Sequence, residues 1–88
     1  MERTLTIRNS LGVHARPAAL FVQTASRFKA KITLERDGIE VNGKSIMGVL
    51  MLAAECGARL LIRTEGVDAG EALEALSDLV EVRMFDET

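Results

Sequence analysis

One short stretch near the N-terminus combines residue types that could bind and transfer an anionic group. Residues 12–18 hold the only histidine and the only proline of the chain, and Arg16 follows His14 closely. Proline is tolerated in the first turn of a helix, because the N–H that it lacks would be unpaired there. Pro17 therefore predicts a helix that begins close to His14.

The start of a helix is a place where anions bind. The first backbone N–H groups of a helix have no partner within it, and the helix dipole is positive at this end. Arg16 adds a guanidinium whose geometry matches phosphate or carboxylate oxygens. A histidine here can act as a nucleophile beside these donors. The residue types alone predict an anion site with a possible nucleophile, and the alternative is a surface or capping histidine without chemistry.

Composition bounds the class of protein. A chain of 88 residues can bury one small core, so we expect a single domain over residues 1–88. A net charge of −2 and the absence of Trp and Tyr argue against nucleic-acid binding, which needs a basic face and favours stacking platforms. We see no apolar run that approaches the ~20 residues of a membrane span, no signal peptide and only one cysteine, so we expect a cytoplasmic protein.

Alternating polar and apolar residues predict the strands. Such runs occur at 4–8, with Leu5 and Ile7 facing inward, and at 31–35 and 39–41. Asp37-Gly38 separates the last two runs and suits the positive φ angles of a two-residue hairpin turn. A more apolar run at 59–63 predicts a fourth strand in the centre of the sheet.

Apolar residues at helical spacing predict three helices, from Ala15 to about Phe28, from Ile46 to about Ala53 and from Ala69 to about Val80. Ser45 should cap the second helix and Gly57 should end that segment. The buried stripes should be Ala18, Phe21, Val22, Ala25 and Phe28 in the first helix, and Ala72, Leu73, Leu76 and Val80 in the third. We expect Leu20 to point outward and the tail from Glu81 to Thr88 to be frayed.

The predicted order of elements is β-α-β-β-α-β-α. Short strands with one apolar face need helices to cover that face. We therefore predict an α+β fold in which three helices cover one face of a four-stranded, mostly antiparallel sheet and leave the other face open.

The helix after Ser45 is apolar on almost every side, which suggests a second site. Val49 should be core. Ile46, Met47 and Leu50 could form, together with Leu20, a surface patch for another protein, and the alternative is that they are core as well. Ser45 is also a candidate modification site, because a phosphate at a helix start is stabilised by the free N–H groups and the dipole.

The two stretches together resemble those of the HPr family, the histidine-containing phosphocarrier proteins of the bacterial phosphotransferase system. The resemblance covers essentially the whole chain and rests on residues 12–18 and 41–50. It implies an open-faced β-sandwich with four antiparallel strands and three helices. It also implies a transient phosphate on Nδ1 of His14, held by Arg16 and by first-turn N–H groups such as that of Ala15.

The resemblance also implies partners. Phosphorylated enzyme I would supply the phosphoryl group, and a histidine of an enzyme IIA would receive it from a monomeric carrier that is not itself an enzyme and uses no cofactor. Ser45 matches the serine that an HPr kinase/phosphorylase modifies in one branch of the family. The docking surface shared by these partners matches Leu20, Ile46, Met47 and Leu50. Leu11 replaces a small polar residue of many sugar-transport members, and residues 9–12 are also similar to the nitrogen-type branch, so both branches stay open.

Two rival functions can be weighed from the residues. A regulatory adaptor would act through Ser45 and would leave His14 dispensable. A metal carrier would use His14 and Cys56, but the sequence has no CxxC or second histidine to complete a ligand set. Cys56 is better explained as a small buried residue near the end of the second helix. We therefore predict no metal site.

Overall fold

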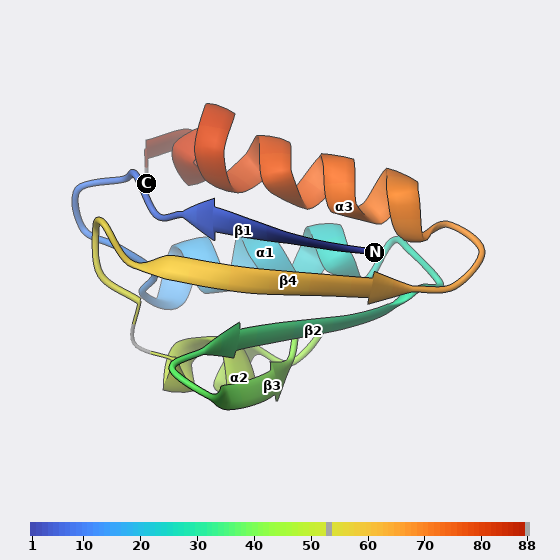
Figure 1. The fold of residues 1–88 in the computed structure, drawn as a ribbon. Helices are drawn as coiled ribbons and strands as arrows, with labels where there is room; N and C mark the ends of the chain where they lie inside the picture. Colours follow the sequence, from blue (N-terminus) through green and yellow to red (C-terminus); the bar gives the residue numbers. More distant parts are fainter. Residues whose placement is uncertain (53, 88) are drawn as a thin grey trace.

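The structure is a computed structural model that describes residues 1–52 and 54–87. Its strands are β1 (Glu2–Thr6), β2 (Lys31–Arg36), β3 (Ile39–Asn42) and β4 (Arg59–Glu65). They form one antiparallel sheet in the order β1-β4-β2-β3 (Figure 1). The apolar strand β4 pairs with β1 on one side and β2 on the other, so its predicted inner position is confirmed.

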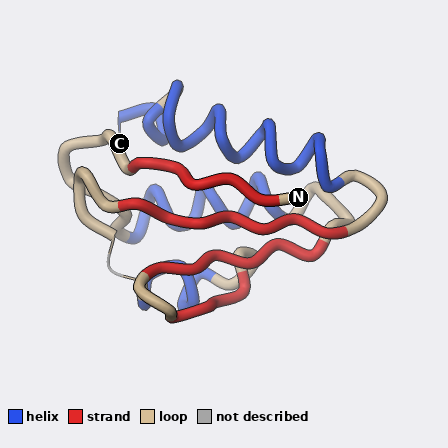
Figure 2. The backbone as a smooth tube through the Cα atoms, in the orientation of Figure 1, coloured by secondary structure: helices blue, strands red, loops and turns tan. Residues whose placement is uncertain are grey.

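The helices are α1 (Ala15–Ala25), α2 (Ile46–Met51) and α3 (Ala69–Ser77). In the view of Figures 1 and 2, α1 lies behind the sheet, α2 lies behind the β2–β3 hairpin, and α3 runs along the β1 edge. This arrangement confirms the predicted α+β fold with an open-faced sheet. None of the helices in the described part of the chain combines the length and apolar character of a membrane span.

The predicted core positions of the first strand and the hairpin turn are confirmed. Leu5 and Ile7 are fully buried, although the strand ends at Thr6 and Ile7 instead donates its N–H to the carbonyl of Ala58 at 2.8 Å. Asp37 and Gly38 both have positive φ angles, 52° and 82°. These are the angles that a two-residue hairpin turn requires.

The first helix is shorter than its apolar spacing predicted. It ends at Ala25, because the N–H groups of Arg27 and Phe28 bond to residues three positions back and tighten the chain into a turn. Val22 and Phe28 are half-buried instead of fully buried. The prediction that Leu20 points outward is wrong, since Leu20 is half-buried and packs against the core.

Three predictions concern the segment after Ser45, and two of them, the end of the segment at Gly57 and the burial of Cys56, are wrong. The helix ends at Met51, and the predicted end at Ala53 lies outside the described residues. Gly57 belongs to the turn before β4, where its φ is 92° and its N–H donates to the carbonyl of Ile7 at 2.7 Å. Cys56 lies in the same turn and is exposed, so it is not the buried residue that we predicted.

The third helix buries its predicted stripe and then changes its winding. A π-helical turn, Asp78–Val82, continues it, and a turn at Met84–Glu87 follows. The prediction of a frayed tail is wrong for residues 81–87, because Phe85 is only 1% exposed and Arg83 pairs with Asp86 at 2.8 Å. The side chain of Phe85 ties this end of the chain to the core.

Side chains of α3 and the π-helical turn cover the free edge of β1. Arg3 donates to the carboxylate of Glu74 at 2.7 Å and to the hydroxyl of Ser77 at 3.0 Å. The N–H of Thr6 donates to the carboxylate of Glu81 at 2.8 Å. An edge strand with unpaired N–H groups invites pairing with another chain, so these contacts protect it.

Candidate functional site

His14 lies at the start of α1, as the position of Pro17 predicted. Its backbone is extended, with φ −110° and ψ −164°, and its carbonyl accepts from the N–H of Ala18 at 2.9 Å. Ala18 is the first residue whose N–H bonds within the helix, because Pro17 has none. The N–H groups of Ala15 and Arg16 are therefore left to bind an anion beside the imidazole.

The imidazole ring of His14 does not cap the helix. It is half-buried, and its Nε2 atom is buried without a hydrogen-bond partner in residues 1–52 and 54–87. Nε2 is therefore not open to a second molecule. Arg16 is exposed on the first turn of the same helix, where its guanidinium can contact an anion held near the ring.

The loop that leads to His14 is held from both sides. Gly12 has a φ of 71°, and a Cβ on it would lie 2.6 Å from the carbonyl oxygen of Ala54. That carbonyl accepts from the N–H of Val13 at 2.7 Å. Asn9 donates from Nδ2 to the carbonyl of Gly12 at 2.6 Å. Sequence reasoning missed Asn9 and Ala54, because the side chain of Asn9 binds a backbone carbonyl and Ala54 contributes one, and residue types do not reveal such backbone partners.

The segment that supports this loop is itself anchored from the sheet. Arg36, at the end of β2, donates to the carbonyl of Leu52 at 3.0 Å and to the carboxylate of Glu55 at 2.7 Å. The hydrogen bond from Arg36 is the main reason why the pKa of Glu55 is lowered from its usual value of 4.5. Strand β2 thereby helps to hold the carbonyl of Ala54 that Val13 uses.

Ser45 caps α2, as predicted. Its backbone is extended, and its hydroxyl oxygen accepts from the N–H of Gly48 at 3.1 Å. The side chain is half-buried at the helix start. Modification of this hydroxyl would change the cap of the helix that carries the apolar residues discussed next.

The predicted docking patch divides into exposed and half-buried residues. Ile46 and Met47 are 44% and 71% exposed, whereas Leu20 and Leu50 are half-buried against the core. Val49 is buried, as predicted. Two further exposed apolar residues, which sequence reasoning did not assign to the patch, are Met51 on α2 and Leu11 in the loop before His14.

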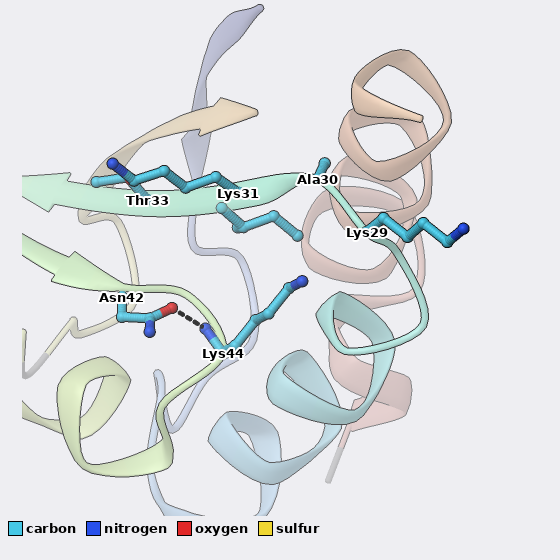
Figure 3. Close-up of a pocket in the computed structure, with 7 residues that line it drawn as sticks. Lys29, Ala30, Lys31, Thr33, Asn42 and Lys44 are labelled. Carbon is cyan, nitrogen blue, oxygen red and sulfur yellow. Dashed lines mark hydrogen bonds between the residues drawn. The ribbon is translucent and has the colours of Figure 1, made fainter. Parts of the chain in front are cut away.

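A hollow of about 300 Å³ lies at the opposite end of α1 from His14. Figure 3 shows the residues around it, with the ammonium groups of Lys29 and Lys31 pointing to opposite sides. The ammonium group of Lys44 donates to the carbonyl of Phe28 at 2.6 Å. The three charges do not converge on one point, so the hollow is not built as an anion site.

Potential metal ligands do not gather in the described residues, which contain no group of three or more His, Cys, Asp or Glu side chains arranged to hold a metal ion. Cys56 lies 3.8 Å from the carbonyl oxygen of Arg8, in the turn before β4.

Comparison with known proteins identifies the family of this site. A family model described as the PTS HPr component phosphorylation site matches residues 1–82. The chain belongs to the HPr family. It is 52% identical over 85 residues to the phosphocarrier protein HPr of Treponema pallidum, with 97% of each chain covered.

Solved HPr structures share the fold. A crystal structure of HPr from Thermoanaerobacter tengcongensis matches with a TM-score of 0.94 at 48% identity, over 100% of this chain and 98% of that chain. Crh, a catabolite repression protein of Bacillus subtilis, matches with a TM-score of 0.74 at 47% identity, over 86% of this chain and 87% of that one. The crystal structure of Crh is described as a domain-swapped dimer.

Proposed function

We propose that this chain is a cytoplasmic, monomeric phosphocarrier whose single domain, residues 1–88, acts through His14. Phosphorylated enzyme I, charged from phosphoenolpyruvate, supplies the phosphoryl group, and a histidine of an enzyme IIA receives it. The observation that carries the proposal is the position of the imidazole beside two N–H groups, at the start of α1, that have no partner among residues 1–52 and 54–87. Membership in the HPr family supports the same reading.

The chemistry asks little of the protein beyond position and charge. The Nδ1 lone pair of His14 attacks phosphorus as the bond to the donor histidine breaks, so the phosphoryl group moves and the donor nitrogen keeps its electron pair. The N–H groups of Ala15 and Arg16 and the guanidinium of Arg16 then face the phosphoryl oxygens. Because Arg16 is exposed, this binding is moderate and the group can be passed on. The protein is therefore a carrier. One partner phosphorylates it and the other removes the phosphoryl group, and these partners are the enzymes.

The apolar surface near α2 is the proposed docking site for enzyme I and enzyme IIA. Ile46 and Met47 supply its exposed part, and Leu20 and Leu50 supply its floor. Partners that dock on these side chains need no deep pocket at His14, which fits the half-buried ring.

Ser45 is the proposed site of regulation by an HPr kinase/phosphorylase. Its hydroxyl caps α2 directly before Ile46 and Met47. A phosphate there would add about −1.5 to −2 charge units beside the apolar docking surface, which should weaken the binding of enzyme I.

The test is incubation of the chain with enzyme I and phosphoenolpyruvate, followed by intact-mass measurement under basic conditions, which preserve phosphohistidine. We expect wild type and Ser45→Ala to gain one phosphoryl group and His14→Ala to gain none. Labelling of His14→Ala would exclude His14 as the acceptor. Adding enzyme IIA proteins of the sugar-transport and nitrogen-type branches should then show which kind removes the label.

A second candidate is a regulatory adaptor that works through Ser45 without phosphoryl transfer. The similarity to Crh, a catabolite repression protein, favours it. This function predicts that Ser45→Asp changes the affinity for a regulatory partner, whereas His14→Ala has no effect on any readout. Failure of wild type to accept a phosphoryl group from enzyme I would decide in its favour.

A further inference from the structure

Asn9 lies in the loop between β1 and α1, and two hydrogen bonds join it to Gly12, one from its buried side-chain amide and one to its backbone carbonyl. Asn9 is 1% exposed. Its Nδ2 donates to the carbonyl of Gly12 at 2.6 Å, and the N–H of Gly12 donates to the carbonyl of Asn9 at 3.1 Å. Residues 9 to 12 therefore form a closed turn.

These contacts fix one particular peptide unit. The carbonyl of Gly12 and the N–H of Val13 belong to the same planar peptide. Asn9 binds the carbonyl end at 2.6 Å, and the carbonyl of Ala54 binds the N–H end at 2.7 Å. A peptide held at both ends cannot rotate without losing a hydrogen bond. It lies one residue before His14, so its orientation influences the direction in which the chain enters α1.

Stability alone does not account for an asparagine at this position. Its Oδ1 is buried without a hydrogen-bond partner in the described residues, and such an atom is costly to bury. An apolar side chain of similar size would avoid that cost but could not donate to Gly12. Aspartate would match the shape, but its ionised carboxylate only accepts hydrogen bonds. The donor at Nδ2 is what distinguishes asparagine here.

We propose that Asn9 is a positioning residue for phosphoryl transfer, which orients the Gly12–Val13 peptide and thereby places the ring of His14 against the N–H groups of Ala15 and Arg16. This inference rests on the proposed function. Transfer between two imidazoles depends steeply on the placement of the reacting atoms, and small displacements lower the rate strongly.

The kinetic test uses Asn9→Leu and Asn9→Asp, which both remove the donor, and Ser10→Ala as a matched control at the exposed neighbour. Rapid-quench measurement of transfer from phosphorylated enzyme I should give a maximal rate about 10- to 100-fold lower for the two Asn9 variants. The concentration for half-maximal rate should not change, because the docking residues on α2 are untouched. Wild-type maximal rates in both variants, or an effect confined to the half-maximal concentration, would overturn the proposal.

Nuclear magnetic resonance on the unphosphorylated protein tests the positioning directly. The chain has two asparagines, and Asn42 is exposed. In wild type we expect the side-chain amide protons of Asn9 to exchange with solvent much more slowly than those of Asn42, and equal exchange would overturn the proposal even if the Asn9 variants fail to fold. In folded variants the ring signals of His14 should shift while those of the sheet stay in place.

The kinetic and the resonance measurements together distinguish a failure of this inference from a failure of the proposed function. If wild type accepts no phosphoryl group, the proposed function fails, and the resonance measurements then decide whether Asn9 orients His14. If wild type is phosphorylated and the Asn9 variants transfer normally, only the positioning role fails.

Discussion

Gly12 lies in the loop that leads to His14 and packs against residues 54 and 55, which support this loop. Its φ of 71° favours glycine, and its α-carbon faces the carbonyl of Ala54 so closely that no side chain fits. Gly38 has a similar φ of 82°, but a Cβ at this position would have no atom within 4 Å. Alanine substitutions at these two glycines therefore distinguish the free-energy cost of a left-handed backbone from the free-energy cost of a steric clash.

We expect Gly38→Ala to lower the free energy of unfolding by about 1–2 kcal/mol, the cost of the left-handed conformation for a residue with a side chain. Gly12→Ala should cost a further ~1–3 kcal/mol, because the added methyl group must displace the backbone near Ala54. Chemical denaturation of both variants measures the difference. Equal losses would mean that the contact of Gly12 with residue 54 is not tight.

Arg16→Ala should slow phosphoryl transfer from enzyme I about 10-fold or more without unfolding the protein. The guanidinium is exposed, would contribute charge to the proposed anion site and does not belong to the core. Rapid-quench kinetics measures the rate, and circular dichroism checks the fold. An unfolded Arg16→Ala protein would show that this side chain has a structural role that we have not recognised.

Residue types predicted part of the candidate site's geometry. The position of His14 and Arg16 at a helix start was predictable because Pro17 fixes where the helix begins. Asn9 was not predictable, since its partner is the carbonyl of Gly12, which any residue would offer. The burial of Leu20 was not predicted, because helical spacing shows which face of a helix is apolar but not how much of the helix surface the core covers.

The turn before β4 acts as an element of the site although it has no regular structure. Arg36 holds Glu55 and Leu52, and this segment in turn contacts Gly12 and Val13. Its geometry could not be predicted, because the apolar pattern after Ser45 suggests a longer helix. The helix instead ends at Met51, and Cys56 is exposed in the turn. The hairpin was predictable because Asp37-Gly38 encodes its turn locally.

The contact between Arg36 and Glu55 should depend on pH. The hydrogen bond from Arg36 lowers the pKa of Glu55 below its usual value of 4.5, so the contact stabilises the folded chain fully above pH 4.5. This stabilisation is lost as the pH falls through the lowered pKa. Carbon-detected titration of Glu55 measures the shift, and Arg36→Met should return the pKa toward 4.5.

Asp37→Asn is the matched control for this titration. It removes a second carboxylate, 3.6 Å from Arg36, without touching the bond to Glu55. We expect the pKa of Glu55 to stay low in this variant. A pKa of Glu55 that did not respond to Arg36→Met would contradict the assigned cause.

At the scale of the whole molecule, the protected β1 edge bears on assembly. Arg3 and Thr6 bind Glu74, Ser77 and Glu81 of the C-terminal helical segment. We therefore expect the chain to be a monomer at micromolar concentration in light scattering coupled to size exclusion. The similarity to Crh, whose crystal structure is a swapped dimer, makes this measurement informative.

Removing the side chains that cover the β1 edge should make pairing with a second chain easier. The double variant Arg3→Ala with Glu81→Ala removes the side-chain contacts that cover the outer edge of β1 and frees the N–H of Thr6, so its dimeric share should rise with concentration. Glu71→Ala, at an exposed position of α3, is a control that leaves the edge covered. A dimeric wild-type chain would contradict the expectation.

One arginine makes ion pairs across the open face of the sheet. Arg63 on β4 pairs with Glu2, Glu35 and Glu40, which lie on the other three strands. The face that these ion pairs cross lies away from α1 and α2, which carry His14 and the exposed apolar side chains. A tether attached to this face, at a position outside the ion pairs, would hold the molecule to a solid support and leave His14 accessible, so that the proposed gain and loss of a phosphoryl group could be followed on a single immobilised layer.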